Sequence, residues 1–331
     1  EVLRSAKDPI YFYDDDVDGL CSFLLCKKAL GEGVGVVVKR AVDREGFFKQ
    51  KIVEHNPDMV VVLDIPELSQ EFIDDAPGVV WIDHHPPQQR ERVTYYNPRI
   101  ENPDNNKSTT QLCYEILDGP LWLCMVGMVG DWCFDERLVK KFREKNAELL
   151  PEEITDPGTA LFASPVGLLA KVFNFCLKGK IKDVKKSVKT LEKIKDPYEI
   201  LQRTTPEGCF IYKRFEEHQK VYDNLLRLAE KLAKDDDELL VYTYDHTNTY
   251  TGELSNELLF KHSDKIIIVA RERSGEMRCS LRSTKYNMRN ILERALVGIQ
   301  GRGGGHEHAC GAGIAKEDWK RFLENIRNHA K

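Results

Sequence analysis

The first ninety residues alternate short apolar runs with longer segments in which apolar and polar positions recur at helical spacing. Apolar runs of four or five residues predict buried strands at residues 10–14, 34–39, 59–65 and 79–83. The segments between them predict helices near residues 19–30 and 44–55, with a shorter helix before the last strand. This alternating order predicts a parallel sheet with helices on both of its faces.

The pattern changes twice further along the chain. From about residue 108 to residue 198 it is helical, and residues 216–234 form an amphipathic segment with few helix breakers. After it, the runs LLVYTY, KIIIVARE and EMRCSLRS predict strands, with helices at GELSNELLFKH and near residues 288–297. We therefore predict an α/β protein of two domains, a parallel-sheet domain at residues 1–205 and a smaller α/β domain at residues 238–331. A connector helix at residues 206–237 would join them.

Composition and charge narrow the classes of protein that fit. The chain has 331 residues, of which 41% are hydrophobic and 31% charged, as in globular proteins of about two domains. The net charge of −5 argues against a protein coated in positive charge for duplex DNA, although a local groove can still be basic. No apolar run approaches the roughly 18 residues of a membrane span, and no leader pattern is visible, so we expect a soluble, cytoplasmic protein without a membrane partner.

One segment, residues 178–195, is rich in lysine and carries eight of them. A helix with one solvated, charged face is the simpler interpretation of such a segment. Contact with nucleic acid is the alternative interpretation.

Three of the predicted strands stop at acidic residues. The first ends in DDDVDG, where Asp14, Asp16 and Asp18 alternate and would point to one side of an extended chain. The next ends at Asp64. Each acid alone could be a helix cap, but the carboxyl ends of parallel strands share one edge of a sheet, so these side chains are expected to gather there. Gathered carboxylates are costly unless cations neutralise them, which predicts a site for two divalent metals.

The triplet Asp83, His84 and His85 closes the last of these strands. Carboxylate and neutral imidazole together suit Mn²⁺, Zn²⁺ or Fe²⁺ better than oxygen ligands alone. Adjacent side chains of a strand point to opposite faces, so we expect one histidine to bind a metal and the other to meet substrate. Asp83 would orient a ring from behind. Asp131, at the end of an apolar helical run, would complete the ligands of one metal.

The glycine-rich segment GRGGGHEHACGAG, residues 301–313, is predicted to form a turn that binds an anion. Consecutive glycines can bring backbone N–H groups against phosphate oxygens, and His306 can donate to the same anion. In the strand before it, Arg278, Ser280 and Arg282 alternate and form a second candidate phosphate clamp. A flexible loop without a ligand is the alternative. The candidate residues of the turn are Gly303, Gly304, Gly305 and His306.

These motifs together resemble the DHH phosphoesterase superfamily. The matching segments are DDDVDG, VVVLD, DHH and VGDWCFDE in the first predicted domain, and SLRS and GGGHEHACG in the second. The second domain is similar to the DHH-associated domain of RecJ-type exonucleases, nanoRNases and alanyl-tRNA synthetases. The two-domain form resembles the archaeal RecJ-like nucleases, and among them the helicase-associated branch.

The resemblance implies ligands for two metals, with Asp64 bridging them. One metal would be held by Asp14, Asp16 and Asp64. The other would be held by Asp18, Asp64, His84 and Asp131. Many relatives carry histidine where this chain has Asp14, and the harder carboxylate favours Mn²⁺, with Mg²⁺ as the alternative. Asp64 and His85 would be the catalytic residues, with His85 facing the scissile phosphate.

The implied reaction is two-metal hydrolysis by a single-strand exonuclease that acts on DNA or RNA and releases 5′-mononucleotides, in the 3′→5′ direction. A cleft one strand wide would exclude duplexes. The implied setting is DNA repair, replication or RNA turnover, with a repair helicase as a partner. The apolar helix faces in residues 159–177 are consistent either with burial under the sheet or with self-association. The alternatives are a nanoRNase-like phosphodiesterase or phosphatase for small nucleotides, and a non-catalytic scaffold. The complete set of acids and histidines counts against the scaffold.

Overall fold

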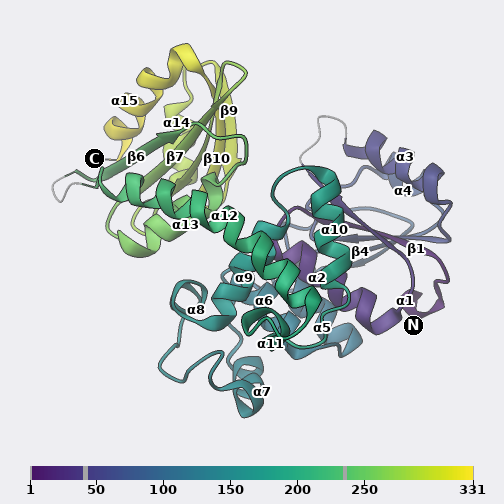
Figure 1. Ribbon diagram of the computed structural model, residues 1–331. Helices are drawn as coiled ribbons and strands as arrows, with labels where there is room; N and C mark the ends of the chain where they lie inside the picture. The colour runs from purple at the N-terminus through teal and green to yellow at the C-terminus, as the bar shows by residue number, and fades with distance from the viewer. Residues whose placement is uncertain (1, 40–43, 234–236, 331) are drawn as a thin grey trace. The chain divides into compact units, whose positions relative to one another are not determined.

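The computed structural model describes residues 2–39, 44–233 and 237–330, which form two compact units. Unit 1 comprises Glu1–Phe215 and unit 2 comprises Glu216–Lys331 (Figure 1). The boundary falls within the long helix α12 (Pro206–Glu230), which is the predicted connector helix. Each unit has its own sheet, so the predicted α/β class with a smaller second domain is confirmed.

Unit 1 is built on a five-stranded sheet in which every pair of neighbours is parallel. Its order is β2 (Val34–Val38), β1 (Pro9–Asp14), β3 (Met59–Leu63), β4 (Val79–Ile82) and β5 (Val93–Tyr96). Strands β1, β3 and β4 are almost wholly buried, which explains why they appear in the sequence as unbroken apolar runs. Strand β5 was not predicted, because VTYY is short and follows a long polar segment.

Helices cover both faces of this sheet, as the alternating pattern predicts. On one face, the rings of Phe48 in α3 (Arg44–His55) and Phe72 in α4 (Gln70–Asp75) pack with Phe12 of β1. On the other face, Phe23 of α2 (Val17–Leu30) packs against Tyr11 and Tyr13. Helix α2 in turn contacts α5 (Thr109–Leu117) and α6 (Leu121–Gly130). The aromatic side chains of β1 therefore fix how α2, whose start carries candidate ligands, lies against the strands.

The remainder of unit 1 is helical, as predicted for residues 108–198. Its helices are α1 (Val2–Ser5), α7 (Glu136–Asn146), α8 (Pro157–Ala163), α9 (Pro165–Cys176), α10 (Ile181–Leu191) and α11 (Tyr198–Leu201). Among the described residues, no single helix has the length and apolar character needed to cross a membrane. The pair α8 and α9 meets that test only when taken together, and it bends by 74° at the junction.

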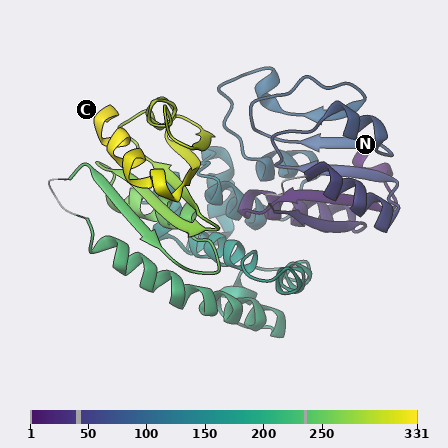
Figure 2. The same ribbon diagram turned by 90° about the horizontal axis from the view of Figure 1, so that it is seen from above.

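Unit 2 has a mixed five-stranded sheet. Its order is β6 (Leu239–Tyr244), β7 (Ile266–Arg273), β8 (Glu276–Arg282), β10 (Ala309–Ala315) and β9 (Gly301–Gly305). Only β6 and β7 are parallel. Helices α14 (Met288–Ala295) and α15 (Trp319–His329) pack on one face, and Figure 2 shows α15 in yellow across it. Helix α13 (Thr251–Lys261) contacts β7 and β8, and Asn256 of this helix bonds Arg282, which points away from that core.

The prediction of a turn at residues 301–313 is wrong, because this segment forms the hairpin of β9 and β10. Glycine has low strand propensity, which is why the segment resembles a loop in the sequence. The core side of β9 has no room for side chains: a Cβ on Gly303 would lie 2.9 Å from the Ala312 Cβ and 3.0 Å from Leu292 Cδ2. Close packing against α14 therefore requires glycine there.

Candidate metal centre

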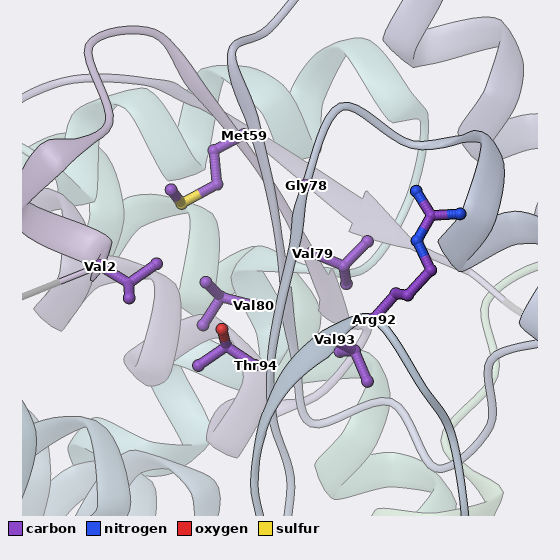
Figure 3. A pocket seen from close by; sticks show the side chains of 8 residues that line it. All are labelled: Val2, Met59, Gly78, Val79, Val80, Arg92, Val93 and Thr94. Carbon is purple, nitrogen blue, oxygen red and sulfur yellow. The ribbon is translucent and has the colours of Figure 1, made fainter.

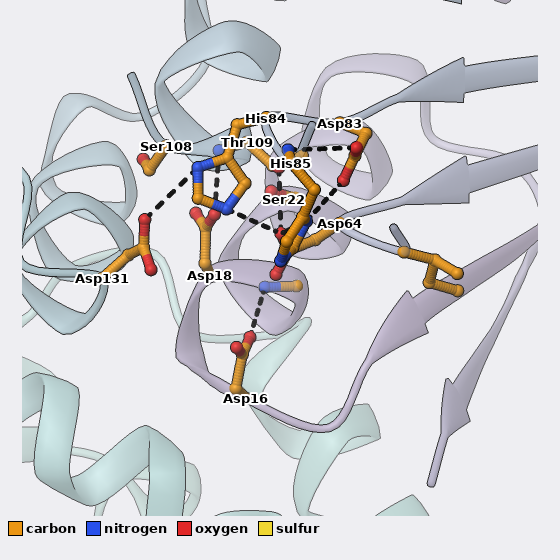
Figure 4. Close-up of polar contacts among 12 residues, drawn as sticks. Asp16, Asp18, Ser22, Asp64, Asp83, His84, His85, Ser108, Thr109 and Asp131 are labelled. Atoms are coloured by element: carbon orange, nitrogen blue, oxygen red, sulfur yellow. Dashed lines mark hydrogen bonds and ion pairs between the residues drawn. The ribbon is translucent and has the colours of Figure 1, made fainter. Parts of the chain in front are cut away.

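The acidic residues predicted from the strand ends gather at the carboxyl edge of the unit 1 sheet. Asp14 ends β1, and Asp64 and the triplet Asp83–His85 directly follow β3 and β4. Asp16 and Asp18 stand at the start of α2, and Asp131 follows α6. Figure 4 shows Asp16, Asp18, Asp64 and Asp131 converging on the two histidine rings. Residues from five segments of the chain thus meet at one place.

Two helix N-termini hold carboxylates of this group. Asp16 caps α2 and accepts the N–H of Gly19 at 2.9 Å. Asp18 is 1% exposed and accepts the N–H groups of Thr109 and Thr110 at the start of α5, both at 2.8 Å. N–H groups at a helix start favour an anion, so they hold Asp18 in place. A Cβ on Gly19 would lie 2.7 Å from the backbone of Asp14, so glycine lets α2 begin beside β1.

Asp64 lies at the middle of the cluster, and its backbone is in the left-handed region, with a φ of 59°. Asp tolerates this conformation better than most residues, and such residues are frequent at functional sites. The Thr109 hydroxyl donates to its carboxylate at 3.1 Å. Burial, together with the charges of Asp16, Asp18 and other nearby carboxylates, raises the pKa of Asp64 well above its usual range. A buried anion among anions needs a cation to stay charged.

Both histidines of the triplet approach Asp64 from the same side. His84 Nε2 lies 3.3 Å and His85 Nδ1 lies 3.9 Å from Asp64 Oδ1, and the two rings form an edge-on pair 4.6 Å apart. The expectation that they point to opposite faces is wrong, because β4 ends at Ile82 and the triplet is no longer part of the strand. His84 also reaches Asp131, with 3.6 Å between Nδ1 and Oδ2.

Asp83 and Asn97 fix the position of His85 through hydrogen bonds to its ring and its backbone carbonyl. Asp83 is fully buried and lies 2.8 Å from His85 Nδ1. Asn97, which caps a short 3₁₀ helix after β5, directs its Nδ2 at the His85 carbonyl (2.9 Å), the Tyr95 hydroxyl (2.9 Å) and Asp83 Oδ2 (3.4 Å). Although burial lowers the pKa of His85, the hydrogen bond to Asp83 and the nearby carboxylates raise it overall. Asn97 was missed because nothing in the local sequence links it to the triplet.

Asp131 occupies an unfavourable position for an anion. It follows the last turn of α6, where the helix dipole is negative, and burial with the charges of Asp18 and Asp16 raises its pKa well above the usual range. The next residue, Trp132, has a left-handed φ of 58°. Only a positive partner would make this placement favourable.

The ligand atoms form three overlapping groups, within each of which they lie no more than 4.8 Å apart. The groups are Asp14–Asp16–Asp64, Asp18–His84–Asp131 and Asp64–His84–His85. Burial and the Asp16 charge also raise the pKa of Asp14, to about 7. Mutually repelling carboxylates mixed with imidazole nitrogens are a donor set for divalent cations such as Mn²⁺ or Zn²⁺. The residues present therefore fit a metal centre, with Asp64 shared between two groups.

The candidate anion-binding residues of unit 2 lie on the face of its sheet away from the α14–α15 core. In β8, Arg278, Ser280 and Arg282 pair in register with Gly313, Gly311 and Ala309 of β10. Gly304 of β9 pairs with Gly311 on its other side, so Ser280, Gly311 and Gly304 form one row across the three strands. A Cβ on Gly304 would meet nothing within 4 Å. The backbone of β9 is therefore open to close approach from this face.

The arginines of this face differ in how firmly they are held. Arg282 donates from Nε to Asn256 at 2.7 Å and from Nη1 to two backbone carbonyls, and burial lowers its pKa to about 10. Arg278 is exposed and pairs with Glu276 at 2.7 Å. Arg302 lies in the Arg278 row and was missed, because strand alternation was not expected in the glycine-rich segment. His306 is exposed at the hairpin turn and Gly305 is the last residue of β9.

A separate hollow of about 390 Å³ lies at the opposite edge of the unit 1 sheet (Figure 3). Its lining includes Met59, Val79 and Val93, which begin β3, β4 and β5. Because parallel strands carry the acids at their other ends, this hollow takes no part in the metal centre.

Two family models match the chain. The N-terminal domain of the DHH family matches residues 10–155, and the DHHA1 domain matches residues 236–331. The first match includes every residue of the acidic cluster, and the second includes the glycine-rich hairpin. No curated protein sequence matches the chain significantly.

Solved structures share the fold at low sequence identity. RecJ from Thermus thermophilus in complex with Mn²⁺ is 16% identical with a TM-score of 0.71, and the match covers 99% of this chain and 52% of that one. The chain thus spans about half the length of that RecJ. An exonuclease RecJ bound to manganese is 16% identical, with a TM-score of 0.63 over 99% and 91% of the two chains. The pGpG-specific phosphodiesterase PggH from Vibrio cholerae is 14% identical, with a TM-score of 0.54 over 97% and 98%.

Proposed function

The chain belongs to the DHH family and carries a DHHA1 domain, and we propose that it is a metal-dependent phosphoesterase that degrades single-stranded nucleic acid. The observation that carries this proposal is the convergence of five carboxylates and two imidazoles into three overlapping ligand groups, two of which share Asp64. Such a set is costly to build without cations, and paired divalent cations are used by many enzymes for phosphoester hydrolysis.

We assign the ligands of two cations from these groups. Asp14, Asp16 and Asp64 would hold one cation, and Asp18, His84 and Asp131 would hold the other with Asp64 shared. When bound, the cations would supply Lewis-acid activation of water and of the phosphate. We propose Mn²⁺ as the physiological ion, because an imidazole ligand favours it over Mg²⁺. RecJ structures with Mn²⁺ and with Mg²⁺ share this fold, so they support a divalent cation, and the choice of Mn²⁺ rests on the imidazole ligand.

The protein's own groups would orient the substrate phosphate. With Nδ1 held by Asp83, His85 keeps Nε2 for donation to a phosphate oxygen, which would stabilise negative charge developing during hydrolysis. In unit 2, Arg282 makes no hydrogen bond through Nη2 to the described residues, and the space above Gly304 is open to a ligand. These groups would bind a neighbouring phosphate or the end of the strand.

The finer assignment is a 3′→5′ exonuclease that releases 5′-mononucleotides. The shared fold with RecJ exonucleases over nearly the whole of this chain supports exonuclease activity, and the direction rests on the resemblance to the helicase-associated branch alone. A small-nucleotide phosphodiesterase is the second candidate, because PggH has the same fold and a closely similar length. A helicase partner, self-association and a cytoplasmic location stay predictions.

Digestion of 20-nucleotide single strands labelled at either end, with Mn²⁺ and Mg²⁺ compared, tests the proposal. We expect the wild type to release mononucleotides from the 3′ end of both DNA and RNA substrates. The variant Asp64→Asn should give no product. The surface variant Asp104→Asn, which makes the same change at an exposed residue, should digest like the wild type. Cleavage confined to dinucleotides such as pGpG would favour the second candidate, and no Mn²⁺-dependent cleavage of either substrate would contradict both.

A further inference from the structure

Helix α10 has one buried and one charged face. Val184, Ser187, Val188 and Leu191 are buried, at the spacing i, i+3, i+4, i+7 that defines one side of a helix. Lys182, Lys185, Lys186 and Lys189 follow the same spacing on the other side, and all four are exposed. We call these four residues the α10 lysine face.

The lysines of this face have no acidic partners among the residues that the structure describes. Within the ranges that the structure describes, none of the four forms an ion pair, and Lys186 instead lies over the Phe210 ring at 4.7 Å. Some other lysines of unit 1 do form ion pairs, for example the half-buried Lys49 with both Glu71 and Asp75 at 2.9 Å. Residues 178–195 carry eight lysines and two acidic residues, which is a net charge of +6. The whole chain has a net charge of −5, so the remaining residues together carry −11. The positive charge is thus concentrated, and its members repel one another without a bound anion.

The lysine-rich segment starts beside the metal centre. Lys39 donates to the carbonyl of Leu177 at 2.8 Å and pairs with Asp15 at 3.3 Å. Asp15 stands between the candidate ligands Asp14 and Asp16. A polyanion at the acidic cluster would therefore meet positive charge at Lys178 and then along α10.

We propose that the α10 lysine face binds the phosphodiester backbone of the single strand that the metal centre cleaves. The inference rests on the proposed function and names a part of the substrate beyond the scissile phosphate. The eight helical residues from Lys182 to Lys189 span about 12 Å, which at about 3.4 Å per stacked nucleotide corresponds to roughly three or four phosphates. Lysine contacts of this kind recognise charge without sequence preference.

The test is the salt dependence of binding. The double variant Lys185→Gln/Lys189→Gln is titrated with labelled 20-nucleotide DNA and RNA strands in EDTA, which prevents cleavage. Losing two phosphate contacts should make the negative slope of log K against log salt shallower by about 1.4. This change corresponds to about 25-fold weaker binding at 0.1 M salt. The control is Lys140→Gln/Lys145→Gln, which removes the same charge from exposed positions of α7 and should keep the wild-type slope.

Substrate length gives the second readout. In Mn²⁺, the ratio of kcat/KM for the 20-nucleotide strand to that for a dinucleotide should fall in the α10 variant and not in the α7 control. Equal slopes and equal ratios for wild type and α10 variant, with Mn²⁺-dependent cleavage intact, would overturn this inference alone. A wild-type protein that neither binds nor cleaves single strands would overturn the proposed function as well.

Discussion

Replacing Asp64 by asparagine tests whether its carboxylate is shared by two cations. The substitution keeps the shape of the side chain and an oxygen that can still accept from the Thr109 hydroxyl, now 3.1 Å away. It removes the charge that two of the ligand groups have in common. We therefore expect the variant to fold and to lose its response to Mn²⁺.

The size of that response follows from ligand linkage. A cation at 100 times its Kd stabilises the folded state by about 2.7 kcal/mol. For a unit of 215 residues, about 2–4 °C of melting temperature corresponds to 1 kcal/mol, so wild type should gain about 5–10 °C for each site. Asp64→Asn should gain less than about 1 °C.

Without metal the sign of the effect reverses. Two like charges 4.8 Å apart repel by about 3.5 kcal/mol at an effective dielectric of 20, and protonation of the raised-pKa carboxyls makes this an upper limit. Removing the central charge should therefore raise the melting temperature of the metal-free protein. Asp131→Asn should raise it as well, whereas Asp104→Asn, at an exposed position, should not.

Differential scanning calorimetry with EDTA and with increasing Mn²⁺ measures both effects. A variant that melts lower than wild type in EDTA, or that keeps the full Mn²⁺ response, would refute the placement of Asp64 at the centre of a cation site.

Three further predictions concern separate contacts. Asp131→Asn should reduce bound Mn²⁺ from two ions to one per chain by elemental analysis, because the Asp14–Asp16–Asp64 group stays intact; unchanged stoichiometry would count against its role as a ligand. Asn97→Ala should keep the metal content but lower kcat about tenfold at constant KM, because His85 loses a buried support worth about 1–3 kcal/mol; a change in KM alone would contradict this. Gly303→Ala should destabilise unit 2 by about 1–3 kcal/mol through overpacking, whereas Gly304→Ala should fold normally and raise KM; equal thermal denaturation of the two variants would contradict the assigned faces.

Much of unit 1 could be predicted from sequence because its strands are buried on both faces. Unbroken apolar runs mark β1, β3 and β4, and parallel order places their acidic ends together without knowledge of side-chain positions. The gathering of Asp14, Asp64 and the histidines follows from that topology. Sheet topology could not place Asp131, because its helix lies outside the alternating pattern.

What could not be predicted depends on local geometry. The two histidines lie on one side because β4 ends one residue before Asp83, and strand ends are not visible at that precision in a sequence. Thr109 and Asn97 reach the cluster from distant segments through hydrogen bonds that have no sequence signature. The glycine-rich hairpin was missed because its strands are selected by close packing, not by propensity.

A crystal of the protein soaked in Mn²⁺ and measured for anomalous scattering tests the central claim most directly. The account predicts two manganese peaks at the carboxyl edge of the unit 1 sheet, with the Asp64 carboxylate contacting both. One peak should lie against Asp14 and Asp16, and the other against Asp18, His84 and Asp131. A single peak that leaves Asp64 without contact, or no peak among these residues, would contradict it.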